Sequence, residues 1–74
     1  MESYKVRCIH EYFELMERII KLEKMLLLDK AGALDFELNC PVELLQRQFM
    51  AMMTYRACLL ERMKIEMPDF AIET

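Results

Sequence analysis

Glycine and proline are almost absent from this chain of 74 residues, which holds one glycine and two prolines. Both residue types interrupt regular structure, and the segment from Ser3 to about Leu28 contains neither. The residues of that segment are good helix formers. The breaks fall at Gly32 and Pro41 in the middle of the chain and at Pro68 near its end. This spacing predicts two long helices in one small domain.

Cysteine is also scarce and poorly spaced for a structural crosslink. Cys8, Cys40 and Cys58 are odd in number, widely separated and without a CxxC pair, and His10 is the one histidine. This pattern argues against a disulfide framework and against a zinc site, and it indicates a reducing cytosol. Chains this short usually need a disulfide, a metal or a partner chain for stability. Oligomerisation is therefore the source of stability that we expect.

Several functional signatures are missing as well. The net charge is −3 with acids and bases interspersed, so the chain lacks the basic stripe that would bind a nucleic-acid polymer. No apolar run approaches the roughly 20 residues that span a bilayer, and the start lacks the pattern of a signal peptide. Glycine loops that hold phosphates, nucleophile elbows and metalloprotease helices are absent. We expect a cytoplasmic protein that does not bind membranes, is not an enzyme and has no cofactor or metal.

Apolar residues of the first segment recur at heptad spacing. With Ile9 at position a, positions a, d, e and g are mostly apolar, and charged residues occupy b, c and f. Tyr12 falls at position d, and Phe13, Ile20 and Leu27 fall at position e. Four apolar positions in seven form a stripe that is wider than the seam of a two-stranded coiled coil. The first helix can therefore contact more than one neighbour.

The boundaries follow from local signals. The first helix is expected over about 3–28 and the connection over about 29–40, with Gly32 as a helix C-terminal cap. Pro41 suits the first position of a second helix that is capped by Cys40 or Asn39.

That second helix is expected over about 41–67, because Pro68 ends it, and a short tail follows over 68–74. The connection carries Leu34, Phe36 and Leu38, which we expect to pack over the end of the molecule. A short connection makes two long helices antiparallel neighbours. The predicted fold is all-α, a two-helix antiparallel hairpin that assembles into a homo-oligomer.

The segment 49–60 is apolar on almost every side. A helix that is apolar all round is buried all round, and a chain of this length has too little other protein to surround it. Self-association is the consequence. The predicted core of the oligomer comprises Phe49, Met52, Met53, Leu59 and Leu60.

Arg56 interrupts this apolar segment. A guanidinium on a buried seam needs an anionic partner, because an unpaired buried charge costs several kcal/mol. One candidate partner is a carboxylate, from Glu14 or Glu17 of the first helix or from Glu23 of a neighbouring subunit. The other is a phosphate or carboxylate of a ligand, which the planar five-donor group would suit. Both interpretations stay open at this level, and ion pairs are the commoner outcome.

A second cationic group is expected at the open end of the hairpin. Antiparallel helices bring Tyr4, Lys5 and Arg7 near Arg62 and Lys64. These side chains could grip an anion with a tyrosine stacked on a ring, although a solvated helix end would have the same composition. Arg47 is expected near the other end of the hairpin, across from a second set of basic residues: Arg18, Lys21 and Lys24.

Several segments resemble a family of small helical-hairpin proteins encoded by phages and prophages. The similarity covers nearly the whole chain and lies in motifs of fold rather than of catalysis. The motifs are Tyr4-Lys5-Val6-Arg7, Glu11-Tyr12-Phe13-Glu14-Leu15, Lys21-Leu22-Glu23-Lys24, residues 34–45, Gln48, Ala51-Met52, Tyr55 and Leu60-Glu61-Arg62.

The second helix, with Gln48 before Phe49-Met50-Ala51 and Arg56-Ala57 further on, is also similar to phage hairpin proteins that sequester cyclic nucleotide signals of anti-phage immunity. That similarity implies a symmetric assembly with ligand pockets at subunit interfaces and no turnover. Its implied contacts are Arg56, Arg47 and a tyrosine of the first helix, Tyr12 or Tyr4, and the cations Lys5 and Arg7 of the open end complete the candidate ligand contacts.

Two functions are therefore expected as alternatives. The first is an anti-defence protein of the host-cell cytosol that binds a cyclic nucleotide or a related anionic small molecule. The second is an oligomeric adaptor or inhibitor that binds a host or phage protein through the apolar face of the hairpin. Arg56 separates them, because a ligand site needs its guanidinium reachable, whereas an adaptor needs only that it be paired.

Overall fold

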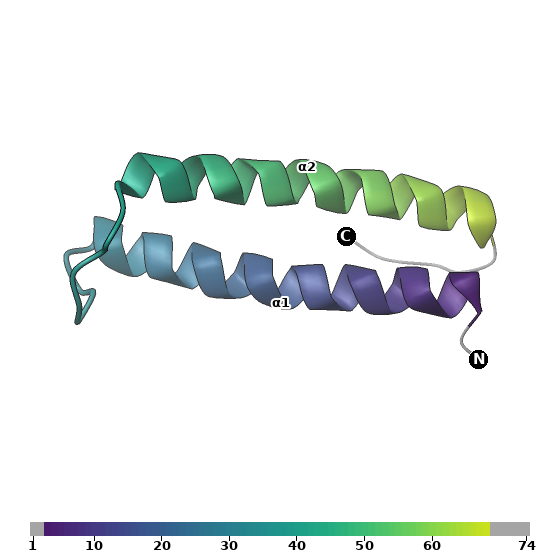
Figure 1. The fold of residues 1–74 in the computed structure, drawn as a ribbon, viewed down its shortest axis with the longest axis horizontal. Helices are drawn as coiled ribbons and strands as arrows, with labels where there is room; N and C mark the ends of the chain where they lie inside the picture. The colour runs from purple at the N-terminus through teal and green to yellow at the C-terminus, as the bar shows by residue number, and fades with distance from the viewer. Residues whose placement is uncertain (1–2, 69–74) are drawn as a thin grey trace.

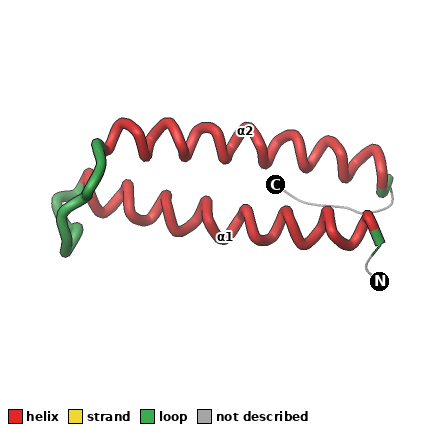
Figure 2. Tube along the Cα trace, viewed as in Figure 1, coloured by secondary structure: helices red, strands yellow, loops and turns green. Residues whose placement is uncertain are grey.

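The computed structural model describes residues 3–68. Helix α1 comprises Tyr4–Lys30 and helix α2 comprises Val42–Glu66. The helices lie side by side and antiparallel, and the connection joins them at one end (Figures 1 and 2). This arrangement confirms the predicted all-α hairpin. The expected tail, apart from Pro68, lies outside the described residues.

Helix α1 is capped at both ends. The Ser3 hydroxyl accepts a hydrogen bond of 3.1 Å from the backbone N–H of Val6, which satisfies one of the free donors of the first turn. Beyond Lys30 the chain turns at Gly32, whose φ is +70°. The N–H of Ala33 donates to the carbonyl of Leu28 at 2.8 Å, and that of Gly32 donates to Asp29 at 3.0 Å. This pattern is a Schellman motif with glycine at its left-handed position, so the predicted role of Gly32 is confirmed.

Helix α2 begins one residue later than the sequence predicts. Pro41 occupies the N-cap position, with φ −59° and ψ 138°, and no side chain caps the helix. Neither Cys40 nor Asn39 is the cap, because the fixed φ of proline fits the extended cap position as well as the first helical one. At the other end the N–H of Met67 donates to the carbonyl of Met63 at 2.8 Å.

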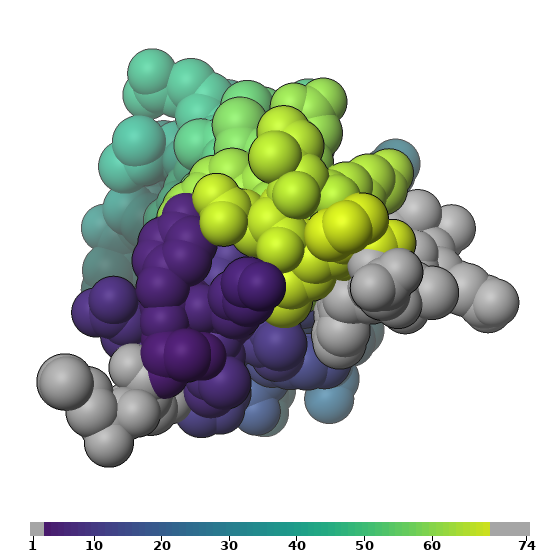
Figure 3. All heavy atoms as spheres, turned by 90° about the vertical axis from the view of Figure 1, so that its right-hand side faces the viewer, coloured from purple at the N-terminus to yellow at the C-terminus, as the bar shows by residue number. Residues whose placement is uncertain are grey.

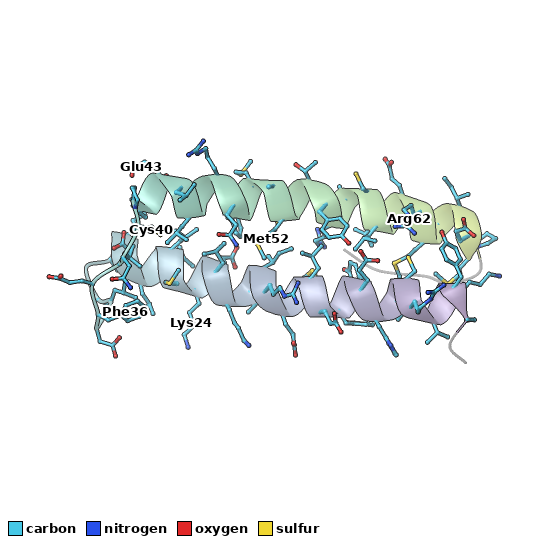
Figure 4. All side chains as sticks on the ribbon, in the orientation of Figure 1. Lys24, Phe36, Cys40, Glu43, Met52 and Arg62 are labelled. Carbon is cyan, nitrogen blue, oxygen red and sulfur yellow. The ribbon has the colours of Figure 1, made fainter. Side chains whose placement is uncertain are left out.

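The core is a single seam between the helices. Its buried side chains are Cys8, Tyr12, Leu15, Ile19 and Leu22 from α1 and Leu59 and Met63 from α2. The five from α1 all fall at heptad positions d and g. Leu59 is fully buried, and Met52 points from α2 toward α1 (Figure 4). Within residues 3–68 no helix is long and apolar enough to cross a bilayer.

Position e of α1 stays uncovered. Phe13, Ile20 and Leu27 are 59%, 58% and 61% exposed, although they belong to the same wide apolar stripe. Helix α2 therefore covers only one side of that stripe. In the connection Leu34 and Leu38 are half-buried as expected, but Phe36 is exposed.

Candidate anion-binding sites

Arg56 lies half-buried on α2, beside α1. Its Nε donates a hydrogen bond of 3.0 Å to Sδ of Met16. A thioether is a weak acceptor, so this contact satisfies the guanidinium poorly. Among the described residues no carboxylate pairs with Arg56, and neither Glu14 nor Glu17 is therefore its partner within the hairpin. The other N–H donors of Arg56 have no hydrogen-bond partner among residues 3–68.

Met16 connects Arg56 to a groove on α1. The groove has a volume of about 420 Å³ and is lined by His10, Phe13, Glu14, Met16, Glu17 and Ile20. Its lining is mainly apolar, and the carboxylates of Glu14 and Glu17 are potential hydrogen-bond acceptors. The groove therefore offers an aromatic surface and acceptors, with a cation next to its methionine wall.

The open end of the hairpin holds a second cationic site. Nη2 of Arg62 donates a hydrogen bond of 3.0 Å to the Tyr4 hydroxyl, and the guanidinium carbon lies 5.9 Å from the centroid of the same ring. Arg62 and Tyr4 line a groove of about 300 Å³ together with Arg7, Cys8 and Glu11. In Figure 3 the beginning of α1 (purple) lies against the end of α2 (yellow) at this site. The sequence-based grouping of Tyr4, Arg7 and Arg62 therefore corresponds to one place in the structure.

The electrostatics of this open-end site follow from its contacts. The hydrogen bond that Arg62 donates to Tyr4 raises the pKa of the guanidinium above its usual value, with Cys8 and Glu11 contributing in the same direction. Arg62 therefore stays charged under all physiological conditions. The carboxylate of Glu11 reduces the positive potential that an anion would meet there.

A third groove lies between the helices, nearer the connection. It measures about 370 Å³ and is lined by Arg18, Lys21, Leu22, Met25, Leu45, Gln48 and Met52. Arg47 is exposed on α2 and does not line it. This groove is mainly apolar with two cations at its rim.

The structure separates the other residues that the sequence grouped as ligand contacts. Tyr12 is 6% exposed in the core, with its ring edge-on to Phe13 at a centroid distance of 5.5 Å. Lys5 is exposed near the open end but is not part of the groove there. Arg56, Arg47 and the Tyr4 site occupy three different parts of the hairpin.

The residues predicted to form the core of the oligomer lie wholly or partly against α1. Leu59 is fully buried within one hairpin, and the others are half-buried against the same core. Those others are Phe49, Met52, Met53 and Leu60. A single hairpin thus already covers much of the surface that the sequence predicted to be buried between subunits.

Sequence reasoning missed the contact between Arg56 and Met16. The sequence did contain a signal for this contact. Met16 occupies position a, which is the edge of the apolar stripe on the side of α2. A group of three or more His, Cys, Asp or Glu side chains suited to a metal is absent from the part of the chain that the structure describes.

Comparison with known proteins identifies a family. The sequence model of the Sequestin family matches residues 2–65, which is most of the chain. The protein belongs to this family, and the membership suggests a sequestering, binding role rather than a catalytic one. No curated protein and no solved structure matches the chain.

Proposed function

From membership of the Sequestin family we propose that this protein sequesters a nucleotide-type immune signal without turning it over, in the cytosol of a phage-infected cell. Arg56 is the principal contact of the anionic part of the ligand. The observation that carries the proposal is the half-buried guanidinium of Arg56, whose hydrogen-bond acceptor among residues 3–68 is a methionine sulfur at 3.0 Å. A half-buried cation is stabilised more by an anionic partner than an exposed cation is.

The groove next to Met16 supports a ligand with two chemically different parts. Phe13 offers an aromatic face on which a base can stack. Glu14 and Glu17 repel a phosphate but accept hydrogen bonds from an exocyclic amine of a base. A nucleotide combines an amine-bearing base with a phosphate, so its base suits the groove on α1 and its phosphate suits Arg56.

Calorimetry against cyclic dinucleotides, cyclic trinucleotides and adenosine-ribose signals tests the proposal. Wild-type protein should bind at least one member of this panel. Arg56→Lys keeps the charge but loses the bidentate geometry, so affinity should fall at least tenfold, or about 1.4 kcal/mol. Arg56→Met should abolish binding and leave the helical circular dichroism unchanged.

Two control variants separate the possible roles of Arg56. Arg62→Met makes the same substitution at the open-end site, and it should leave affinity within about twofold if Arg56 is the contact. Glu23→Gln removes the carboxylate that a neighbouring subunit could supply. If Arg56→Met and Glu23→Gln weaken the assembly equally and the wild type binds nothing in the panel, Arg56 is a structural ion-pair member.

The alternative function is an adaptor or inhibitor of a host or phage protein. The exposed apolar residues of α1, among them Phe13 and Ile20, favour it specifically. In that case Phe13→Ala should weaken capture of the protein partner while Arg56→Met leaves it intact, whereas ligand binding should be lost with Arg56→Met.

A further inference from the structure

The exposed apolar residues of α1 lie on one line. Val6, Phe13, Ile20 and Leu27 follow one another at intervals of seven residues, and all four are exposed, by 40%, 59%, 58% and 61%. We call these four residues the e stripe. A strict seven-residue repeat is the spacing at which one helix packs along another helix. Because α2 covers positions d and g, the e stripe is a second apolar seam without a partner among residues 3–68.

Charges beside the e stripe show an ordered pattern. Position b, on the side away from α2, carries Glu17 and then Lys24, and both are exposed. The next position outward, f, carries the exposed residues Arg7, Glu14 and Lys21 in that order. The flank is therefore acidic over residues 14–17 and basic over residues 21–24. Lys24 points away from α2 in Figure 4.

We propose that the e stripe binds the e stripe of a second copy of this chain, with the two α1 helices antiparallel and Ile20 at the two-fold axis. An antiparallel two-fold brings a flank against the same flank of the other copy. The acidic part of the flank of one copy, residues 14–17, then meets the basic part of the other, residues 21–24. A parallel pair would bring position b against position a, so Lys24 would meet Glu23 of the other copy but Glu17 would face Met16, without an opposite charge.

The charge pattern also selects the register. With Ile20 opposite its own copy, Phe13 lies opposite Leu27 of the second copy. Glu17 then lies opposite residue 23 of the second copy, and Lys24 of that copy is offset from Glu17 by one residue, about 1.5 Å along the helix axis. Shifting the pair so that Phe13 faces Ile20 would place Glu17 opposite Glu17, where like charges repel. The register centred on Ile20 therefore satisfies both the apolar seam and its flank.

A matched pair of variants tests the location of the seam by sedimentation. Ile20→Glu places two carboxylates at the axis, so the dissociation constant of the dimer should rise at least tenfold. Ile65→Glu makes the same change at an isoleucine that is 79% exposed on α2, and it should leave the dimer unchanged. If Ile65→Glu dissociates the protein as much as Ile20→Glu does, or if Ile20→Glu has no effect, the e stripe is not the seam.

Mixing two charge variants tests the orientation and keeps the proposal testable if single variants fold poorly. Glu14→Lys with Glu17→Lys makes the flank wholly basic, and Lys21→Glu with Lys24→Glu makes it wholly acidic. Each protein alone should dissociate, and native mass spectrometry of the equimolar mixture should show mainly the mixed dimer. A mixture in which neither protein gains a partner overturns the antiparallel arrangement.

Engineered cysteines test the register. In a background with Cys40→Ser and Cys58→Ser, Phe13→Cys and Leu27→Cys proteins should form a disulfide-linked dimer when mixed, and neither should do so alone. Crosslinking of Phe13→Cys with itself would indicate a parallel pair. No crosslink in the mixture would overturn the register. The e stripe shares Phe13 and Ile20 with the groove next to Met16, so in this dimer that groove lies at the subunit interface. None of these measurements uses a nucleotide or changes Arg56, so they test the dimer separately from ligand binding.

Discussion

The two helices contribute unequal numbers of residues to the buried core. Helix α1 contributes five of the buried side chains and α2 contributes two, Leu59 and Met63. Leu59 is 0% exposed, and it packs into the middle of a seam that has only two helices to form it. A side chain in this position has no second layer of protein that could relax into the space it leaves.

Leu59→Ala should therefore lower the free energy of unfolding by about 2–5 kcal/mol. Leu44→Ala is the matched control, since it is the same substitution in the same helix at a residue that is 46% exposed. It should cost less than about 1 kcal/mol. Urea unfolding at one fixed protein concentration measures both, and equal losses would show that the face of α2 is wrongly assigned.

Individual side-chain contacts were the least predictable part of the candidate sites. The sequence predicted that Arg56 needs a partner, and antiparallel geometry predicted that Tyr4 and Arg7 lie near Arg62. The sequence could not predict that the Nε of Arg56 points to the sulfur of Met16 rather than to a carboxylate. That choice depends on rotamers at the edge of the seam, which heptad spacing does not specify.

At the level of the helices, the predictions succeeded where the pattern was asymmetric. In α1 the polar positions b, c and f identify the solvated face, and the buried residues all come from the predicted apolar positions, although they occupy d and g and leave position e exposed. In α2 the segment 49–60 is apolar on almost every side. The spacing of its apolar residues therefore could not show which face packs on α1. Leu59 faces the core, whereas Met50, a few turns earlier, is 64% exposed.

The end of α1 depends on the backbone conformation of one residue. Gly32 has φ +70°, and a Cβ built there would meet no atom within 4 Å. The cost of Gly32→Ala is therefore one of backbone conformation alone, about 1–2 kcal/mol. Gly32→Asn should cost less, because asparagine adopts this conformation more readily.

Thermal or urea unfolding of Gly32→Ala, Gly32→Asn and wild type at equal concentration checks this order of stability. An alanine variant as stable as the wild type would mean that the Schellman turn does not limit the stability of the hairpin. A loss well above the backbone cost would point to contacts of the connection that a single hairpin does not make.

On the scale of the whole molecule, one hairpin leaves each helix half uncovered. Its extents are 43 × 24 × 18 Å, which is a single layer of two helices. The exposed apolar residues of the e stripe on α1, with Met50 and Tyr55 on α2, lie outside the one seam that the hairpin forms. Small folds with so little enclosed core commonly need association for stability.

We therefore expect the folded state to depend on protein concentration. For a dimer that unfolds to two chains, tenfold dilution removes about 1.4 kcal/mol. With an unfolding entropy of about 2.1 cal/mol/K per residue over both chains, the melting temperature should fall by about 4 °C. Circular dichroism melts between about 1 and 100 µM, without any nucleotide, measure this slope, and Ile20→Glu should flatten it while lowering stability at high concentration. A melting temperature of the wild type that does not change over this range would mean that the hairpin folds as a monomer, and the e stripe would then be available to a different protein.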